Sequence, residues 1–225
     1  MVFIQYWWQF LIVCVASYLI GATNFAIAFS RLIKLQDIRN YGSGNAGTTN
    51  MFRVYGLTLG ALTLLCDSLK SVVCILLTHW IFADIVQPQA FVQLKYFAGL
   101  FAVIGHVLPV YYGFRGGKGV AAAIGCIFTL HPRLALCLLI PQILVILFTD
   151  RMSVSSLLLS LFMLVWTWVV VHKKTDLVCA ICFTLTFLLV IFAHKGNIAR
   201  LLNGKENKTG VIKAITGKKD KINKL

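Results

Sequence analysis

The sequence carries little charge, and very little of it is negative. Charged residues make up 12% of the 225 residues, against roughly 25% in soluble domains, and only 7 of them are Asp or Glu. This scarcity excludes a water-soluble enzyme. Disorder is excluded as well, because 59% of the residues are hydrophobic and 12% are aromatic. The remaining class is a small polytopic membrane protein, whose length allows at most about eight crossings of roughly 20 residues.

Several other functional classes lack their sequence signals. The seven cysteines all lie in apolar segments, which favours buried packing over disulfides. The five histidines form no ligand-spaced cluster with Cys, Asp or Glu, so we predict neither a metal site nor a cofactor. The net charge is +14, but no basic run alternates with stacking aromatics, so nucleic acid is not an expected partner. No Lys or Arg precedes the first apolar stretch, so no cleavable signal peptide is expected.

Apolar stretches predict the fold class, an all-α polytopic membrane protein with a seven-helix bundle. The stretches cover residues 3–29, 57–82, 97–112, 120–130, 134–148, 154–171 and 177–193. The fourth is too short to span comfortably, and with the fifth it could form a hairpin that dips in from one side. No internal repeat or linker is present. We therefore expect one membrane-embedded domain, residues 1–225, with a basic cytoplasmic tail from about residue 194 to 225.

The distribution of basic residues predicts the orientation of this bundle. Under the seven-crossing topology, one face holds sixteen of the 21 Lys and Arg residues, nine of them in the C-terminal tail. The opposite face holds four: Lys95, Arg133, Lys173 and Lys174. Because cytoplasmic loops are enriched in Lys and Arg, the N-terminus is predicted outside and the C-terminus inside. The basic tail is expected to lie against anionic lipid.

The loop after the first apolar stretch has the composition of an anion-binding loop. Its glycines allow positive φ and a close approach to a ligand, and its Ser, Thr, Asn and Arg side chains offer hydrogen bonds and charge. The glycine spacing also matches the dinucleotide fingerprint, but that fingerprint needs a preceding strand, and a membrane helix precedes this loop. We therefore reject a nucleotide site. The candidate residues are Gly42, Ser43, Gly44, Asn45, Thr48, Asn50 and Arg53.

A second loop, residues 105–120, combines glycines with Lys118 directly before a predicted helix. Consecutive N–H groups and the positive end of that helix are suited to hold a phosphate. The loop is not a Walker A motif, because Tyr112 replaces the first glycine and Gly119 replaces the magnesium-binding Ser or Thr. An alternative is a flexible basic turn against lipid. The candidate residues are Arg115, Gly116, Gly117, Lys118 and Gly119.

A third polar cluster begins where the last apolar stretch ends. His194 and Asn197 are three residues apart and would share a face if the helix continues, and Arg200 and Glu206 follow. Ser153 is assigned to the same side of the membrane by the charge count. Within the second stretch, Asp67 and Lys70 are also three apart, and we interpret them as an ion pair that supports the site rather than as catalytic groups.

These three loops, in this order, resemble those of the PlsY-type acyl-phosphate:glycerol-3-phosphate acyltransferases. Residues 42–50 resemble the first motif of that family, residues 105–122 the second, and residues 194–208 the third. The chain departs from the family pattern at four positions: Ala46 for Pro, Arg115 for Lys, Ala122 for Thr, and Ala193 for the Arg that commonly precedes the histidine. The resemblance implies a seven-helix bundle in the bacterial cytoplasmic membrane with its motifs on the cytoplasmic side, and no metal or cofactor.

The reaction implied by the resemblance moves a fatty acyl group from acyl phosphate to the 1-hydroxyl of glycerol 3-phosphate, giving lysophosphatidic acid. In this hypothesis the second loop and Lys118 bind the acyl phosphate. Asn197 donates to the developing oxyanion, a contribution of about 3 to 4 kcal/mol. The residues expected to hold glycerol phosphate are Ser43, Arg53, Ser153 and Arg200. The base that takes the hydroxyl proton is either His194 or the phosphate of the substrate itself.

Two other functions match parts of the sequence less well. Another class of glycerol-phosphate acyltransferase uses His and Asp with four residues between them, as in His79 and Asp84, but this pair lies at the opposite end of the second helix from the polar loops. A phosphate-ester carrier or anion channel would need a site near the midplane and often has repeated halves, whereas the polar residues here gather at one face. The sequence therefore favours the acyltransferase. It does not predict an oligomeric state.

Overall fold

A computed structural model describes residues 2–209 of the chain, and every regular element in that range is a helix. The tail residues 210–225, including most of the predicted lipid-binding lysines, lie outside the described residues. The longer helices follow the predicted apolar stretches, so the all-α membrane fold is confirmed. The helices are α1 (Val2–Gln5), α2 (Trp7–Ala22), α3 (Phe25–Lys34), α4 (Thr48–Tyr55), α5 (Leu57–Phe82), α6 (Pro88–Val107), α7 (Val120–Leu130), α8 (Pro132–Thr149), α9 (Met152–Trp166), α10 (His172–Lys174), α11 (Leu177–Ala193) and α12 (Lys195–Leu202).

The first predicted helix is broken into separate segments. Helix α2 ends at Ala22, and α3 starts at Phe25 after a two-residue interruption. Asn24 causes the restart, because its side-chain oxygen accepts a hydrogen bond from the Ile27 N–H at 3.0 Å and so caps α3. This break leaves the carbonyl of Thr23 and the N–H of Phe25 available to other partners in the bundle.

By length and composition, five or six of the helical segments described can cross a membrane. Five helical segments are long and apolar enough to cross a membrane, and α11 with α12 would make a sixth, although the two are bent by 53°. Helix α7 has 11 residues, about 16 Å of rise, which is too short for a hydrocarbon core of roughly 30 Å. The seven-crossing topology and its orientation therefore stay predictions.

The centre of the bundle is closely packed because glycines let helices touch through their backbones. A Cβ on Gly21 of α2 would lie 2.2 Å from the Ala102 carbonyl oxygen of α6. A Cβ on Gly105 of α6 would lie 2.3 Å from the Tyr18 carbonyl oxygen of α2. Small residues at such contacts are typical of membrane helix pairs.

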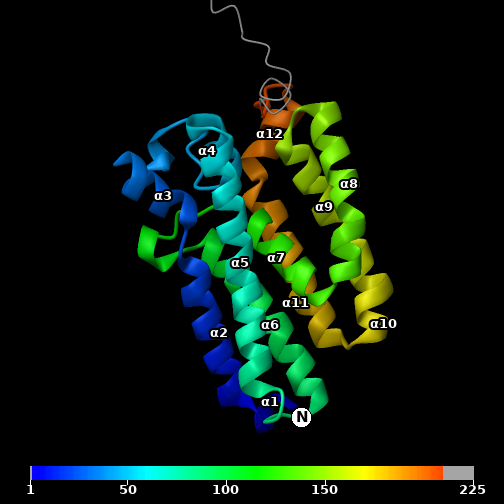
Figure 1. The fold of residues 1–225 in the computed structure, drawn as a ribbon. Coiled ribbons are helices and arrows are strands. Elements are labelled where there is room, and N and C mark those ends of the chain that lie inside the picture. Colours follow the sequence, from blue (N-terminus) through cyan, green and yellow to red (C-terminus); the bar gives the residue numbers. More distant parts are fainter. Residues whose placement is uncertain (1, 210–225) are drawn as a thin grey trace, which may run out of the picture.

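The predicted polar loops gather at one end of the molecule. Figure 1 shows α3, α4 and α12 at the end opposite the N-terminus and α10, with α5 running most of the distance between the two ends. Because α4 leads directly into α5, and α12 directly follows α11, the first and third loops are held at the ends of long core helices. The fold thus brings together segments that are about 150 residues apart in the sequence.

Candidate active site

The first loop is shaped around one buried amide. Asn50 in α4 donates to the Tyr41 carbonyl oxygen at 2.9 Å and to that of Ile38 at 3.2 Å, and its own oxygen accepts from the Ser43 N–H at 2.9 Å. A Cβ on Gly42, which has φ +60°, would lie 2.3 Å from that amide oxygen. Asn50 and Gly42 therefore fix the course of the loop, which sets the position of Ser43.

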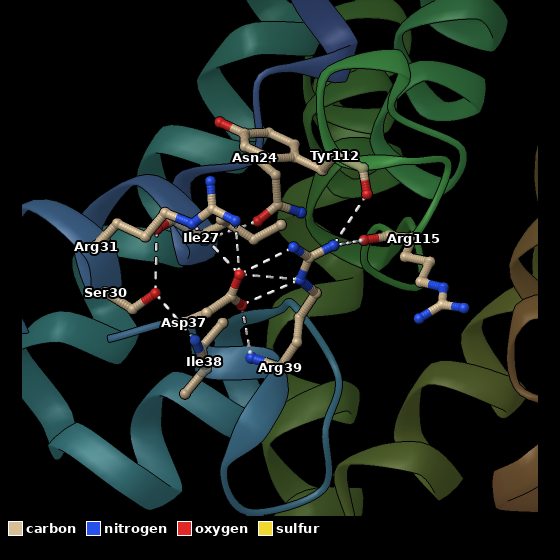
Figure 2. A network of polar contacts seen from close by, with 9 residues as sticks. All are labelled: Asn24, Ile27, Ser30, Arg31, Asp37, Ile38, Arg39, Tyr112 and Arg115. Carbon is tan, nitrogen blue, oxygen red and sulfur yellow. Dashed lines mark hydrogen bonds and ion pairs between the residues drawn. The ribbon is translucent and has the colours of Figure 1, made fainter. Parts of the chain in front are cut away.

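An ion-pair network joins the first loop to the second. The Asp37 carboxylate lies 2.9 Å from Arg39 and 2.8 Å from Arg31, and Arg39 also donates to the Tyr112 carbonyl oxygen at 2.9 Å. Hydrogen bonds from Arg39 hold the pKa of Asp37 far below its usual range. Figure 2 shows that the Arg115 guanidinium points away from this network and that only its carbonyl oxygen takes part, at 3.4 Å from Arg39.

The glycines of the second loop do not act as the sequence suggested. The Gly116 and Gly117 N–H groups were expected to face a phosphate, but they donate to the carbonyl oxygens of Val107 and His106 at 3.2 and 3.1 Å. A Cβ on Gly116 would lie 2.0 Å from the His106 oxygen. These glycines allow close packing instead. The N–H groups at the start of α7, from Gly119 onward, remain available for an anion.

The third cluster is organised by a carboxylate. His194 lies at the bend between α11 and α12, and it is buried, with its Nδ1 2.8 Å from the Val190 carbonyl oxygen. One oxygen of Glu206 accepts from Asn197 at 2.6 Å and from Ser153 at 2.7 Å, and the other accepts from Arg200 at 2.9 Å. These bonds let Glu206 orient the other three side chains, and its predicted contact with substrate stays a prediction.

The three loops enclose a single cavity of about 240 Å³. Twelve of the predicted residues line it: Ser43, Asn45, Thr48, Asn50, Arg53, Lys118, Gly119, Ser153, His194, Asn197, Arg200 and Glu206. Five do not: Gly42, Gly44, Arg115, Gly116 and Gly117. Apolar residues of the helices also line the cavity: Leu64, Val120, Ala121, Ile124, Ile146, Met152 and Leu159. The lining of the cavity is therefore partly polar and charged and partly apolar.

Sequence reasoning missed several polar residues in this cavity. Gln142 of α8 contacts Ser155 of α9 through a side-chain hydrogen bond, and both line the cavity. His106, at the end of α6, also lines it, as does Asp67, which the sequence placed only in support of the site. Gln142 had no recognisable signal, but the buried Asp67 and Lys70 marked the region, since ionisable groups within a membrane helix usually face a polar interior.

The part of the cavity around Lys118, Arg53 and Arg200 is positively charged. The pKa of Lys118 is lowered to about 8, chiefly by burial; the nearby Glu206 opposes this shift, and Arg200 and Arg53 add to it. Burial opposes ionisation of Glu206, but the hydrogen bonds from Ser153, Asn197 and Arg200 outweigh burial and hold its pKa below the usual range. Around Lys118 the site thus holds three cationic side chains and the carboxylate of Glu206, while the second carboxylate of the lining, Asp67, is paired with Lys70. This leaves a net attraction for a polyanion such as a phosphate ester.

Comparison with known proteins shows the family to which this chain belongs. The sequence model of the glycerol-3-phosphate acyltransferase family matches residues 11–204. The chain belongs to the glycerol-3-phosphate acyltransferase family. It is 37% identical over 200 residues to the glycerol-3-phosphate acyltransferase of Finegoldia magna, covering 89% of this chain and 96% of the relative. The corresponding enzyme of Bartonella henselae is 39% identical over 205 residues, covering 91% and 92%. The protein is therefore an acyltransferase of membrane lipid synthesis.

The solved structures of a family member share this fold. PlsY (YgiH), described as an integral membrane glycerol 3-phosphate acyltransferase, in its glycerol 3-phosphate form matches 92% of this chain and 98% of its own chain, with a TM-score of 0.80 and 30% identity. Its lysophosphatidic acid form matches with a TM-score of 0.76 and 28% identity. The PlsY-type resemblance drawn from the three loops is confirmed, and this acyltransferase is an integral membrane protein.

Proposed function

We propose that this acyltransferase moves a fatty acyl group from acyl phosphate to the 1-hydroxyl of glycerol 3-phosphate, releasing phosphate and lysophosphatidic acid. The supporting observation is the mixed lining of the cavity. Lys118, Arg53 and Arg200 lie near one another in it and suit phosphate groups, and the apolar side chains of the same lining suit an acyl chain. Because the basic residues concentrate at this end of the bundle, we propose that the site faces the cytoplasm, in the cytoplasmic membrane of a bacterium.

The proposed reaction needs no covalent acyl-enzyme. The glycerol hydroxyl oxygen attacks the acyl carbon, a tetrahedral oxyanion forms, and the bond from carbon to the phosphate oxygen breaks. The hydroxyl proton passes to His194 or to the phosphate itself. Lys118 and the first N–H groups of α7 would bind the leaving phosphate, while Arg53, Ser43 and Arg200 would hold glycerol 3-phosphate. Asn197 uses one N–H on Glu206 and keeps its second for the oxyanion.

The reaction can be tested directly with purified protein in detergent. Given acyl phosphate and glycerol 3-phosphate, the protein is expected to release inorganic phosphate and to form lysophosphatidic acid in equal amounts. A carrier or channel would release no phosphate. Replacing acyl phosphate with an acyl thioester, such as acyl-coenzyme A, serves as the control. Product formed from the thioester but not from acyl phosphate would contradict the proposed donor.

The lowered pKa of Lys118 predicts how substrate affinity depends on pH. Its ammonium is charged below about pH 8 and becomes neutral above it, so kcat/KM for acyl phosphate, whose phosphate Lys118 binds in the proposed reaction, is expected to fall by up to about tenfold per pH unit above that value. In Lys118→Arg the guanidinium stays charged, because its pKa is above about 12, and the decline near pH 8 should disappear. An unchanged decline in this variant would assign it to another group.

A further inference from the structure

A buried charged cluster lies at the inner wall of the candidate site. It consists of Asp67 and Lys70 of α5 and His106 of α6, whose exposed fractions are 0%, 4% and 2%. The predicted ion pair is confirmed, with Lys70 Nζ 3.0 Å from Asp67 Oδ1. Asp67 and His106 both line the cavity that also contains Lys118 and Gly119. The catalytic scheme above uses none of the three buried residues.

The ammonium of Lys70 has a partner for each of its three hydrogens. Its Nζ lies 2.7 Å from the Thr23 carbonyl oxygen, 3.0 Å from Asp67 Oδ1 and 2.8 Å from His106 Nδ1. An ammonium has no lone pair to offer, so Nδ1 of His106 must be the acceptor in the third contact. A neutral imidazole that accepts at Nδ1 carries its hydrogen on Nε2. The network therefore assigns His106 to the Nε2–H tautomer.

The alternative tautomer has poorer geometry. A hydrogen on Nδ1 would have to reach Asp67 Oδ1 at 3.5 Å and would face the ammonium at 2.8 Å. The charged groups that face the ring are Lys70 and Asp67, both from α5. The break between α2 and α3 contributes backbone groups only: the Thr23 oxygen to Lys70, and the Phe25 N–H to Asp67 at 3.4 Å. Asp67 balances the charge of Lys70 while Lys70 fixes the ring.

The other side of the ring faces the glycine loop. A Cβ on Gly117 would lie 2.2 Å from His106 Nε2, so any larger residue at this position would collide with that nitrogen. The Gly117 N–H in turn donates to the His106 carbonyl oxygen at 3.1 Å, which fixes the loop against the ring. The nitrogen that carries the hydrogen is thus beside the loop that leads into Lys118 and α7.

We propose that His106, held as the Nε2–H tautomer, donates a hydrogen bond to an anionic oxygen of substrate in the cavity, and that Lys70 and Asp67 are positioning residues for this donor. The oxygen belongs either to a phosphate group or to the oxyanion that forms on the acyl carbon. A neutral imidazole can stabilise developing negative charge in this way without a proton transfer. The substrate part of this inference rests on the proposed function, whereas the tautomer does not.

Substitutions of His106 test whether the donor matters. His106→Gln keeps an N–H near the position of Nε2 and should retain kcat/KM within about fivefold, whereas His106→Leu removes the donor and should lose about 10- to 100-fold. A loss confined to KM would place the contact on a ground-state phosphate, and a loss in saturated turnover would place it on the oxyanion. Equal activity of both variants, whether high or low, would overturn the proposal.

Lys70→Met tests the positioning role through the pH profile. Without the ammonium, Nδ1–H can donate to Asp67, so Nε2 becomes an acceptor and regains a hydrogen only when the ring is protonated. The activity of this variant relative to the wild type should therefore fall as pH rises through the imidazole pKa, which is near 6.5 in an unperturbed histidine. A constant ratio across pH 5 to 8, the range around that pKa, would overturn the positioning role.

Nitrogen NMR of the unmodified protein provides a readout that requires no catalysis. With ¹⁵N-labelled histidine in lipid nanodiscs, and His106→Gln to assign the resonance, we expect the Nε2–H pattern at neutral pH. An Nδ1–H pattern would overturn the inference even if the enzyme is fully active. Conversely, failure of acyl phosphate as donor would refute the proposed function and leave the tautomer assignment unaffected.

Discussion

Replacing His194 with alanine is expected to lower turnover at saturating substrate by about 10²- to 10⁴-fold, the range for loss of a positioned general base. The ring nitrogen Nδ1 lies 2.8 Å from the Val190 carbonyl oxygen, and a carbonyl only accepts, so the hydrogen is on Nδ1. The lone pair is therefore on Nε2, and the ring lines the cavity. Steady-state kcat and KM for both substrates measure the effect.

His79→Ala is the matched control for this experiment. His79 is exposed in the last turn of α5, at the opposite end of that helix from α4 and the candidate site, so its removal should leave kcat and KM unchanged. The result for His194→Ala also distinguishes the two candidate bases. If the substitution raises KM and leaves saturated turnover intact, the substrate phosphate takes the proton and His194 only helps to bind.

Hydropathy predicted the long helices because lipid imposes a simple physical rule: a spanning segment must be apolar and must satisfy its own backbone hydrogen bonds. The same rule says nothing about where a helix breaks. The restart at Asn24 depends on a local cap. The Thr23 carbonyl oxygen at this break accepts a hydrogen bond from Lys70, which lies 47 positions after Thr23 in the sequence. Tertiary contacts of this kind are not visible in a hydropathy pattern.

The sequence also predicted which loops meet, but not what each residue does there. Composition and the order of the motifs were enough to place Lys118, His194 and Asn197 around one cavity. Composition and motif order did not show that the Gly117 N–H donates a hydrogen bond to the His106 carbonyl oxygen, because this pairing depends on where α6 ends. The two histidines of the site illustrate the limit, since their opposite tautomers follow from neighbours that only the fold provides.

Glu206→Ala is expected to reduce kcat/KM by about 10²-fold or more. The substitution removes the common acceptor of Ser153, Asn197 and Arg200, three side chains from two helices that converge on this carboxylate. Without it, the oxyanion donor and a phosphate ligand lose their orientation together, and a misplacement of about 1 Å can cost 10²-fold in rate. Both kcat and KM should change, and steady-state kinetics with each substrate varied in turn would measure the two effects.

Glu206→Gln separates orientation from charge. Its amide oxygen can still accept from Ser153 and Asn197, but its amide nitrogen cannot accept from Arg200, so the variant should mainly raise KM for glycerol 3-phosphate. Asp84→Asn, an exposed carboxylate at the far end of α5, controls for the change in net charge and should have no effect. If Gln and Ala at position 206 lower turnover equally, the negative charge itself is required, and Glu206 would have to contact a substrate hydroxyl rather than align its neighbours.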